Sequence, residues 1–316
     1  MHASQADAAR ADDPRERIPK VSHPVTALSN DAAGAFAGVD VGATLVKLAL
    51  CSGGVTALET LPTNEIEAVA RRLGAAGSER VGLTGGGAPQ LSRLLECENA
   101  SVSEFDAWST GARSMLRAGD EPPARFLLVS VGTGTSAMLV EAHSVQRVGG
   151  SALGGGTVMG LGTALLGHRP FESIAELAAA GDRSHVDLLI SDVYPEGDFL
   201  LPGEVNAASF AKLARRPVDE RPDPRDLAHG VMGLVGENIA LICCGLAAAS
   251  QVERIVFGGT TLRNNPSLVA ILGGTCRALG RQPTFLPQGE FVGALGALER
   301  MRAGVAGTEG GAALRR

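Results

Sequence analysis

Two turns rich in glycine and threonine, each set between apolar segments, carry residue types that can bind phosphate. The first lies in residues 35–50 (AFAGVDVGATLVKLAL) and the second in residues 126–140 (FLLVSVGTGTSAMLV). Each stretch is expected to form a strand, a tight turn and a second strand. Turns of this kind bring backbone N–H groups and short hydroxyl side chains together, so they can hydrogen-bond phosphate oxygens. The pair predicts one phosphate-binding turn in each lobe of a two-lobed ATP-dependent enzyme.

A carboxylate, a hydroxyl and a cation follow one another around the first turn. Asp40 interrupts an apolar strand just before Gly42. A carboxylate there is costly unless it is paired, hydrated or bound to Mg²⁺. Taken alone, Asp40 is more simply explained as a turn-forming residue at a strand end. With Thr44 and Lys47 close behind it, the group suits the β- and γ-phosphates of a nucleotide.

The second turn is made of small and hydroxyl-bearing residues: Gly132, Thr133, Gly134, Thr135 and Ser136. Arg147 and the glycine-rich stretch 149–162 (GGSALGGGTVMGLG) follow it. Glycines just before an apolar helix let the backbone lie against a ligand. An ordinary Gly/Thr hairpin and a helix–helix contact are the alternative interpretations of these two segments.

Glu104 begins a predicted helix and is the candidate general base. It would take the proton of an acceptor hydroxyl as that oxygen attacks phosphorus. A single Glu at a helix start is more often only a favourable partner of the helix dipole. The six histidines are scattered, and none pairs at metal-ligand spacing, so they receive no role.

Several other functional classes lose their main support. The sequence has no GxxxxGK[ST] loop and no strand–GxGxxG–helix with an acidic residue at the proper distance. The net charge of −6 argues against a nucleic-acid surface. No stretch reaches the roughly 20 uninterrupted apolar residues of a membrane span.

The cysteines and the N-terminal stretch indicate a cytoplasmic protein. There are five cysteines and no CxxC pair, and the chain starts without the apolar core of a secretory signal. Cys243 and Cys244 lie in an apolar helical stretch, where we expect buried packing. Residues 1–34 are polar and contain prolines, so they predict a flexible extension, and residues 303–316 a flexible tail.

Hydrophobic periodicity predicts the elements that position these residues. Helices are expected over residues 61–77, 104–119, 173–180, 184–194, 226–250 and 291–301. Strands are expected over 81–86, at the start of 254–268 and over 283–286, with Asn264 or Asn265 capping a helix. Strands and helices alternate in both halves, which predicts an α/β class with two similar lobes, 35–124 and 125–302, and a cleft between them.

In their order along the chain, these segments resemble those of the type II pantothenate kinases, bacterial type, of the actin/hexokinase/Hsp70 ATPase-fold superfamily. The resemblance covers roughly residues 36–301 and rests on nine segments: GVDVGATLVKL, LTGGGA, EFDA, VSVGTGTS, RVGGSALGGGTVMGLG, GDRSHVDLLISDVY, LPGEVNAASF, VFGGTTLRNN and GEFVGALGAL. It implies a two-lobed actin/hexokinase-like (ribonuclease H-like) ATPase fold with a central cleft.

The resemblance also implies a role for each matching residue. Glu104 stands at the catalytic base, and Arg147 matches an arginine that binds the acceptor and stabilises transferred charge. Asp40 is implied near Mg²⁺, and Ser136 falls where the family contacts pantothenate. The positions implied to bind ATP are Asp40, Gly42, Thr44, Lys47, Gly132, Thr133, Gly134, Thr135, Gly154, Gly155, Gly156, Thr157, Gly258 and Gly259.

One segment departs from the family pattern, in which an aromatic-rich acidic stretch precedes the last Gly-rich helix. Here that stretch reads PTFLPQGEF, so Phe285 is the one aromatic at its start that could contact pantothenate. The departure concerns the acceptor end of the pocket and leaves the phosphoryl chemistry unaffected.

The resulting hypothesis is ATP-dependent phosphorylation of pantothenate to 4′-phosphopantothenate, the first step of coenzyme A synthesis, by a homodimer packed on helices of the C-terminal lobe. One alternative keeps the fold and changes the acceptor to a sugar or a specialised natural product. Another is a non-catalytic nucleotide sensor or repressor, which the presence of Asp40 and Glu104 disfavours.

Overall fold

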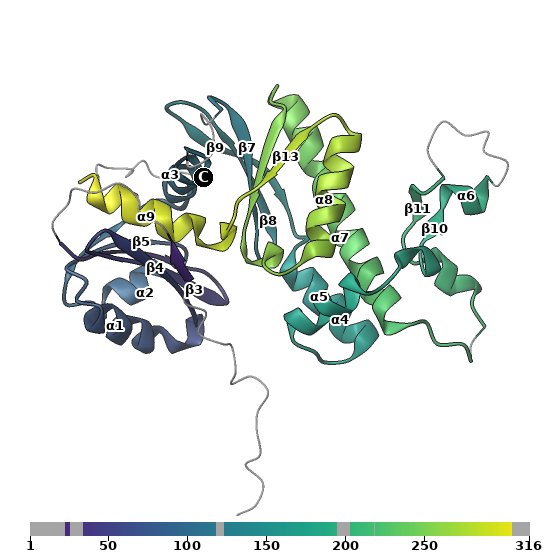
Figure 1. Ribbon diagram of the computed structural model, residues 1–316, viewed down its shortest axis with the longest axis horizontal. Coiled ribbons are helices and arrows are strands. Elements are labelled where there is room, and N and C mark those ends of the chain that lie inside the picture. Colours follow the sequence, from purple (N-terminus) through teal and green to yellow (C-terminus); the bar gives the residue numbers. More distant parts are fainter. Residues whose placement is uncertain (1–22, 26–33, 118–122, 195–202, 218, 305–316) are drawn as a thin grey trace, which may run out of the picture. The chain divides into compact units, whose positions relative to one another are not determined.

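A computed structural model of the chain describes residues 23–25, 34–117, 123–194, 203–217 and 219–304 (Figure 1). The chain divides into two compact units. Unit 1 comprises the residues up to Val102 and those from Ala297 onward, and unit 2 comprises Ser103–Gly296. The predicted lobes, 35–124 and 125–302, stay a prediction, and the compact units divide the chain at other positions.

Unit 1 is built on a six-stranded sheet with the strand order β1-β4-β3-β2-β5-β6. Strands β2, β3 and β4 are antiparallel, while β5 and β6 run parallel to β2. Its elements are β1 (His23–Val25), β2 (Phe36–Val41), β3 (Leu45–Ser52), β4 (Val55–Pro62), η2 (Thr63–Glu65), α1 (Ile66–Ala75), β5 (Arg80–Thr84), α2 (Ala88–Ser92), β6 (Glu98–Ser101) and the last turns of α9 (Val292–Arg302).

Unit 2 is built on a five-stranded sheet with the order β13-β12-β7-β8-β9, and a separate pair, β10-β11. Strands β7, β8 and β9 are antiparallel, and β12 and β13 run parallel to β7. Its elements are α3 (Glu104–Arg117), β7 (Phe126–Val131), β8 (Thr135–Val140), β9 (Val145–Ser151), α4 (Gly155–Leu166), α5 (Phe171–Ala179), η3 (Arg183–His185), β10 (Leu188–Leu189), α6 (Ile190–Val193), β11 (Asn206–Ala208), η4 (Ala211–Arg215), α7 (Pro224–Ala249), β12 (Arg254–Gly258), η5 (Thr260–Leu262), α8 (Pro266–Ala278), β13 (Gln282–Phe285) and η6 (Gly289–Phe291).

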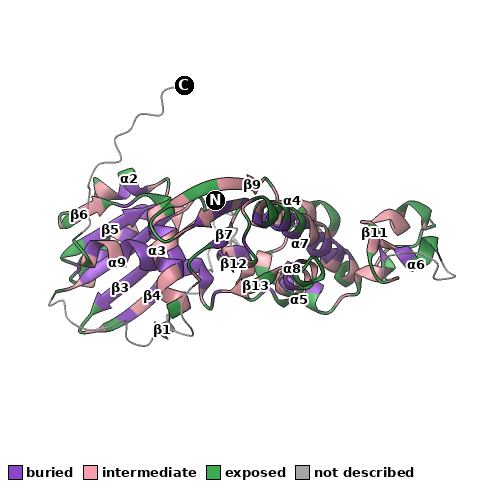
Figure 2. Cartoon of the chain, turned by 90° about the horizontal axis from the view of Figure 1, so that it is seen from above, coloured by how far each residue is buried: buried purple, intermediate pink, exposed green. Residues whose placement is uncertain are grey.

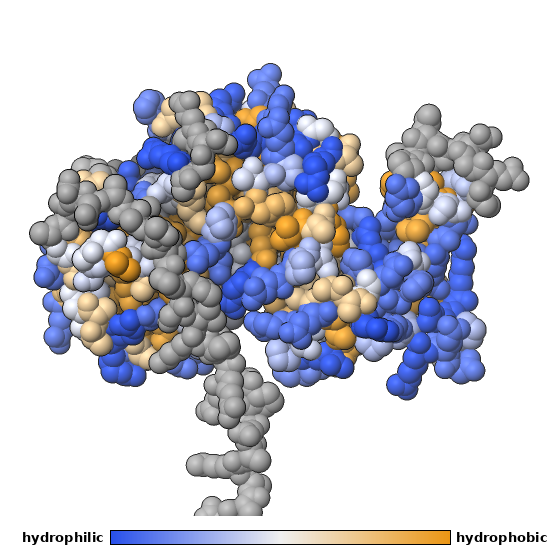
Figure 3. All heavy atoms as spheres, viewed as in Figure 1, coloured by the Kyte–Doolittle hydropathy of each residue, from blue (hydrophilic) through white to orange (hydrophobic). Residues whose placement is uncertain are grey.

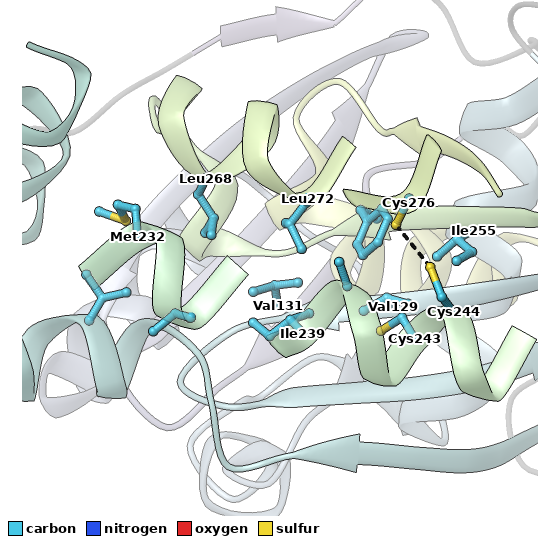
Figure 4. Packing of buried hydrophobic residues seen from close by; sticks show 14 of the residues in the cluster. Val129, Val131, Met232, Ile239, Cys243, Cys244, Ile255, Leu268, Leu272 and Cys276 are labelled. Atoms are coloured by element: carbon cyan, nitrogen blue, oxygen red, sulfur yellow. Dashed lines mark hydrogen bonds between the residues drawn. The ribbon is translucent and has the colours of Figure 1, made fainter. Parts of the chain in front are cut away.

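The central strands of both sheets are apolar on both faces. In Figure 2 the central strands β2, β3 and β5 of unit 1 are largely buried, and all six residues of β2 are buried. Continuous apolar runs of this kind are typical of strands covered on both sides. In unit 2, α7 and α8 pack against β7 and β12: Met232, Ile239, Leu268 and Leu272 meet Val129, Val131 and Ile255 (Figure 4).

The predicted buried helix at 226–250 is confirmed as α7, and it holds Cys243 and Cys244 in the core. The Sγ atoms of Cys244 and Cys276 lie 3.7 Å apart, across the contact of α7 with α8 (Figure 4). Burial raises the pKa of the Cys243 thiol to about 12. Among the described helices, α7 alone has the length and hydropathy of a membrane span, yet 56% of that stretch is buried inside the structure.

Most predicted elements are present, and one prediction is wrong. The helix predicted over 184–194 is instead the short turn η3, the strand β10 and the four-residue helix α6. Tertiary bonds override its periodicity, because Asp187 is buried and accepts a hydrogen bond from the backbone N–H of Phe210 at 2.8 Å. The neighbouring strand β10 pairs with β11.

The predicted tails lie mostly outside the described residues. Within the predicted extension 1–34, residues 23–25 form β1, which pairs antiparallel with β4. At the other end, residues 303 and 304 form a turn after α9, and residues 305–316 lie outside the described part of the chain.

Candidate active site

In unit 1 the hairpin of β2 and β3 places Asp40 directly opposite Lys47. Lys47 Nζ lies 4.0 Å from Asp40 Oδ2. Asp40 is only 6% exposed, and this burial raises the pKa of its carboxyl, while the charge of Lys47 partly opposes the rise. The site therefore holds a carboxylate whose charge the protein alone stabilises poorly.

The turn that joins β2 to β3 is fixed by a hydrogen bond within the turn and by two hydrogen bonds from Thr63. Within the turn, the N–H of Gly42 donates to the carbonyl of Leu45 at 3.1 Å. At the start of η2, Thr63 Oγ1 donates to the carbonyl of Gly42 at 2.9 Å, and the N–H of Thr63 donates to the carbonyl of Thr44 at 3.0 Å. A Cβ on Gly42 would come within 3.0 Å of Lys47 Nζ, so glycine leaves room for this ammonium group.

The second turn, in unit 2, is also closed by a backbone hydrogen bond of its first glycine and held by a threonine hydroxyl. The N–H of Gly132 donates to the carbonyl of Gly134 at 2.9 Å, and Thr261 Oγ1 donates to the carbonyl of Gly132 at 2.8 Å. Thr135 is buried, and its hydroxyl donates to the carbonyl of Leu153 at 2.8 Å. In each unit, then, a threonine from another element bonds the first glycine carbonyl of the turn.

The start of α4 is fastened to this second turn. The N–H groups of Gly155 and Gly156 donate to the carbonyls of Gly132 and Thr133 at 2.8 and 2.9 Å. A Cβ on Gly154 would lie 2.7 Å from Gly134 Cα. The glycines therefore serve a close approach of two backbone segments, and their first two amide donors are already used. A nucleotide contact of Gly154, Gly155, Gly156 and Thr157 remains a prediction.

A third glycine segment, Gly258 and Gly259, packs closely against the end of β7. Gly259 has a positive φ of 117°, and a Cβ there would meet the carbonyl oxygen of Val131 at 2.3 Å. A Cβ on Gly258 would lie 2.9 Å from the carbonyl of Gly289. Glycine is the residue that tolerates both this conformation and these distances. The structure thus brings together the turn 132–134, the start of α4 and the end of β12.

A β-bulge places Arg147 beside Ser136. The register of β8 and β9 shifts so that Ala137 faces Gly149 while Met138 faces Arg147, which leaves Val148 as the extra residue. A Cβ on Gly150 would lie 2.8 Å from Arg147 Nη2, and Gly150 is the strand partner of Ser136. The exposed guanidinium therefore lies over the part of the sheet that carries the Ser136 hydroxyl.

Glu104 is the first residue of α3, as predicted, and it is exposed. The preceding Ser103 caps the helix: its hydroxyl donates to Asp106 Oδ2 at 2.7 Å and accepts from the N–H of Asp106 at 3.1 Å. Asp106, not Glu104, makes these capping bonds. The cap sets where the helix begins and hence where Glu104 stands.

Phe285 has a packing role in the described structure. Its ring stacks on Phe257 with centroids 5.2 Å apart, and it packs against the hydrophobic core of unit 2. Phe257 is fully buried. A contact of Phe285 with substrate stays a prediction.

The residues around Asp40 fit Mg²⁺ of the kind that accompanies a nucleotide. No group of three or more His, Cys, Asp or Glu among the described residues is arranged to hold a metal ion. Mg²⁺ in nucleotide sites typically takes one or two carboxylates together with phosphates and water. A single buried carboxylate with a raised pKa suits that chemistry and does not suit a site made of protein ligands alone.

The sequence did not indicate the threonines that hold the turns. Thr63 and Thr261 lie far from the glycines that they bond, and a single threonine carries no pattern of its own. Glycine-rich turns were recognisable because several unusual residues stand together.

The fold and the two turns place the chain in the class of actin/hexokinase-like ATPase folds. Component A of the (R)-2-hydroxyglutaryl-CoA dehydratase of Acidaminococcus fermentans has a TM-score of 0.59 at 18% identity, over 87% of this chain and 100% of its own. A ROK family glucokinase of Streptomyces griseus, solved with glucose and AMPPNP, has a TM-score of 0.55 at 13% identity, over 85% and 100%. These likenesses establish the fold.

Within that class, the chain belongs to the type II pantothenate kinase family. The profile of the Fumble family matches residues 91–300. The type II pantothenate kinase of Staphylococcus haemolyticus (strain JCSC1435) is 33% identical over 261 residues, which cover 83% of this chain and 98% of its own. That of Staphylococcus aureus (strain USA300) is 30% identical over 83% of this chain and 97% of its own.

Proposed function

We propose that this chain transfers the γ-phosphoryl group of ATP to the primary hydroxyl of pantothenate, which gives 4′-phosphopantothenate and ADP. The observation that carries the proposal is the family membership along nearly the whole length of its relatives. The two glycine turns and the residues Asp40, Lys47 and Arg147 are of the types that this chemistry uses, which supports the proposal.

In the proposed reaction, Glu104 accepts the proton of the pantothenate hydroxyl while that oxygen bonds to the γ-phosphorus. The bond from phosphorus to the bridging oxygen breaks, and ADP leaves with the electron pair. Ser136 and Arg147 bind the acceptor, and the guanidinium also balances charge on the transferred group. This role agrees with the position of Arg147 over Gly150, the strand partner of Ser136.

Asp40 and Lys47 are proposed to bind at the phosphates. Asp40 would hold Mg²⁺, which when bound neutralises charge on the β- and γ-phosphate oxygens. Lys47 and the turn residues Gly42 and Thr44 would contact the phosphates directly.

We further propose that the enzyme is cytoplasmic and acts as a homodimer.

The test is a comparison of acceptors at fixed ATP and Mg²⁺. Pantothenate, pantoate and N-acetylhexosamines are assayed for ADP release, and the phosphorylated product is identified by mass spectrometry. Pantothenate is expected to have the highest kcat/KM. A kcat/KM for another acceptor at least about a thousandfold above that for pantothenate would replace the proposed substrate and keep the phosphoryl transfer.

A further inference from the structure

The end of β5 contains a buried hydroxyl that the proposed reaction does not use. Thr84 is 1% exposed, and its Oγ1 finds no hydrogen-bond partner among the described residues. A buried hydroxyl without a partner destabilises the fold. Valine has nearly the same shape and no such cost, so packing alone does not explain threonine at this position.

Thr84 lies beside Asp40 in the sheet. Strands β5 and β2 run parallel, and Asp40 is the register partner of Thr84. On its other side, Asp40 is the register partner of Lys47. Residues paired in register point to the same face of a sheet. Thr84, Asp40 and Lys47 therefore form a row across three strands, with the carboxylate in the middle.

The backbone after Thr84 approaches the same carboxylate. Gly85 has a positive φ of 86°, and a Cβ there would lie 2.7 Å from Asp40 Oδ1 and 2.5 Å from the carbonyl of Val41. The Oδ1 atom thus leans toward β5, while Oδ2 is the oxygen that lies 4.0 Å from Lys47 Nζ. The two carboxylate oxygens face two different neighbours.

We infer that Thr84 is a positioning residue for Asp40 in the nucleotide-bound protein. Its hydroxyl donates a hydrogen bond to the Asp40 carboxylate and so fixes how that group faces hydrated Mg²⁺. Mg²⁺ demands near-ideal octahedral geometry, so the orientation of its one protein carboxylate matters. The inference rests on the proposed role of Asp40. It also accounts for the hydroxyl, which the structure leaves without a partner among the described residues.

The experiment compares Thr84→Val, which removes the hydroxyl, with Thr84→Ser, which keeps it. Thr56→Val is the matched control, because Thr56 Oγ1 is also buried and without a partner among the described residues. Thr56 lies near the start of β4 and pairs in register with Cys51, not with Asp40 or Lys47. Binding of AMPPNP is measured by calorimetry with Mg²⁺ and again with EDTA. Thermal unfolding is measured for each free protein.

We expect Thr84→Val to weaken AMPPNP binding in Mg²⁺ by about 10-fold or more and to leave binding in EDTA unchanged. Thr84→Ser and Thr56→Val should bind like the wild type. The midpoint of unfolding of Thr84→Val should equal or exceed that of the wild type, because the variant loses a destabilising hydroxyl. If valine prevents folding, Thr84→Ala takes its place in the comparison.

The inference is overturned if Thr84→Val keeps its affinity in Mg²⁺, if serine fails to restore it, or if wild-type affinity does not depend on Mg²⁺. Failure of the proposed function has a different signature. Wild-type protein that binds AMPPNP with the expected Mg²⁺ dependence but does not phosphorylate pantothenate contradicts the function and leaves the role of Thr84 intact.

Discussion

The two carboxylates of the proposed reaction lie in opposite environments. Asp40 is buried inside a strand, and Glu104 is exposed at the start of α3. Burial disfavours the charged form of Asp40, so the free protein holds this group at a cost that a bound cation can offset. Such costs are typical of residues kept for function and not for folding.

The substitution Asp40→Asn should separate stability from activity. Because the folded pKa of Asp40 lies above its unfolded value, the folded protein binds more protons than the unfolded chain between those two pKa values. The free energy of unfolding therefore falls as pH rises through that window. Burial outweighs Lys47 as the cause of the shift. We expect Asn to raise the unfolding midpoint at pH 7 by about 2 °C or more and to lower turnover by about 10²-fold or more.

The gain in stability should disappear at about pH 3 and below, where the pH lies below both pKa values and Asp40 is protonated in both states. Thermal scans of both proteins from about pH 3 to about pH 8 measure it. A lower midpoint for Asp40→Asn at pH 7 would mean that the interaction with Lys47 dominates and that Asp40 stabilises the fold.

Glu104→Gln tests the general base. The amide keeps the size of the side chain and cannot accept the proton, so turnover should fall by about 10²-fold or more with little change in nucleotide affinity. Asp106→Asn is the matched control: it makes the same chemical change two residues further along α3, where Asp106 bonds Ser103. The control should lower stability slightly and leave kcat near the wild-type value. Near-normal turnover of Glu104→Gln would remove Glu104 from the mechanism.

At this scale the sequence indicates residues that stand together in an unusual pattern. Asp40, Gly42 and Lys47 were recognisable for that reason. Thr84 was part of a noted segment, LTGGGA, but its importance depends on the strand register that sets it beside Asp40. Register between distant strands is not encoded by local spacing, so no sequence pattern could have assigned this role.

At the scale of elements, the start of α4 is positioned by backbone contacts that glycine makes possible. A Cβ at Gly154 would lie 2.7 Å from both Gly134 Cα and the carbonyl of Thr133. Backbone atoms of a bonded turn cannot move aside as a flexible side chain can. The second turn and α4 therefore behave as one rigid piece, which is what a phosphate-binding loop requires.

Gly154→Ala and Gly160→Ala make a matched pair within this segment. Gly160 lies in the exposed part of α4, and a Cβ there meets no atom within 4 Å. Alanine at 160 should raise the free energy of unfolding by up to about 1 kcal/mol through helix propensity. Alanine at 154 should lower it by about 1–3 kcal/mol and weaken nucleotide binding. Chemical denaturation measures both, and equal effects at the two sites would contradict the rigid contact.

Two elements show where local pattern fails. The apolar spacing at 184–194 predicts a helix, yet β10 pairs with β11, and the buried Asp187 bonds a backbone N–H of a distant segment. The bulge at Val148 is likewise a property of two paired strands. It sets the position of Arg147, although the residue itself was identified from the sequence.

At the scale of the molecule, the two units repeat one arrangement. Each sheet contains three consecutive antiparallel strands, β2–β4 or β7–β9, and two later strands that run parallel to the first of them. Gly85 in unit 1 and Gly259 in unit 2 both have positive φ, and a Cβ on either would strike the carbonyl of the residue before the turn glycine, Val41 or Val131. This repetition explains why two similar lobes were predictable from the sequence, since each turn carries its own pattern.

The surface of unit 2 is uneven in polarity. In Figure 3, hydrophobic residues gather on the face around β13 and α8, whereas the segment with β10 and β11 is mostly hydrophilic. Helix α7 also exposes apolar side chains: Leu241 is 52% exposed and Ile242 is 38% exposed. Gly245, one turn later, is exposed and has open space at its Cβ position. Exposed apolar side chains that gather on one face are typical of a surface that contacts another protein.

Leu241→Arg tests whether this face of α7 holds two copies of the chain together. The substitution adds a charge to an exposed position, so the fold should remain while a dimer interface is disrupted. Light scattering after gel filtration should show a dimer for the wild type and a species near 32.3 kDa for the variant. Val55→Arg is the control, because Val55 is 59% exposed on β4 in unit 1, and it should remain dimeric. A dimer that survives Leu241→Arg would move the interface away from α7, and a monomeric wild type would end the proposal of a homodimer.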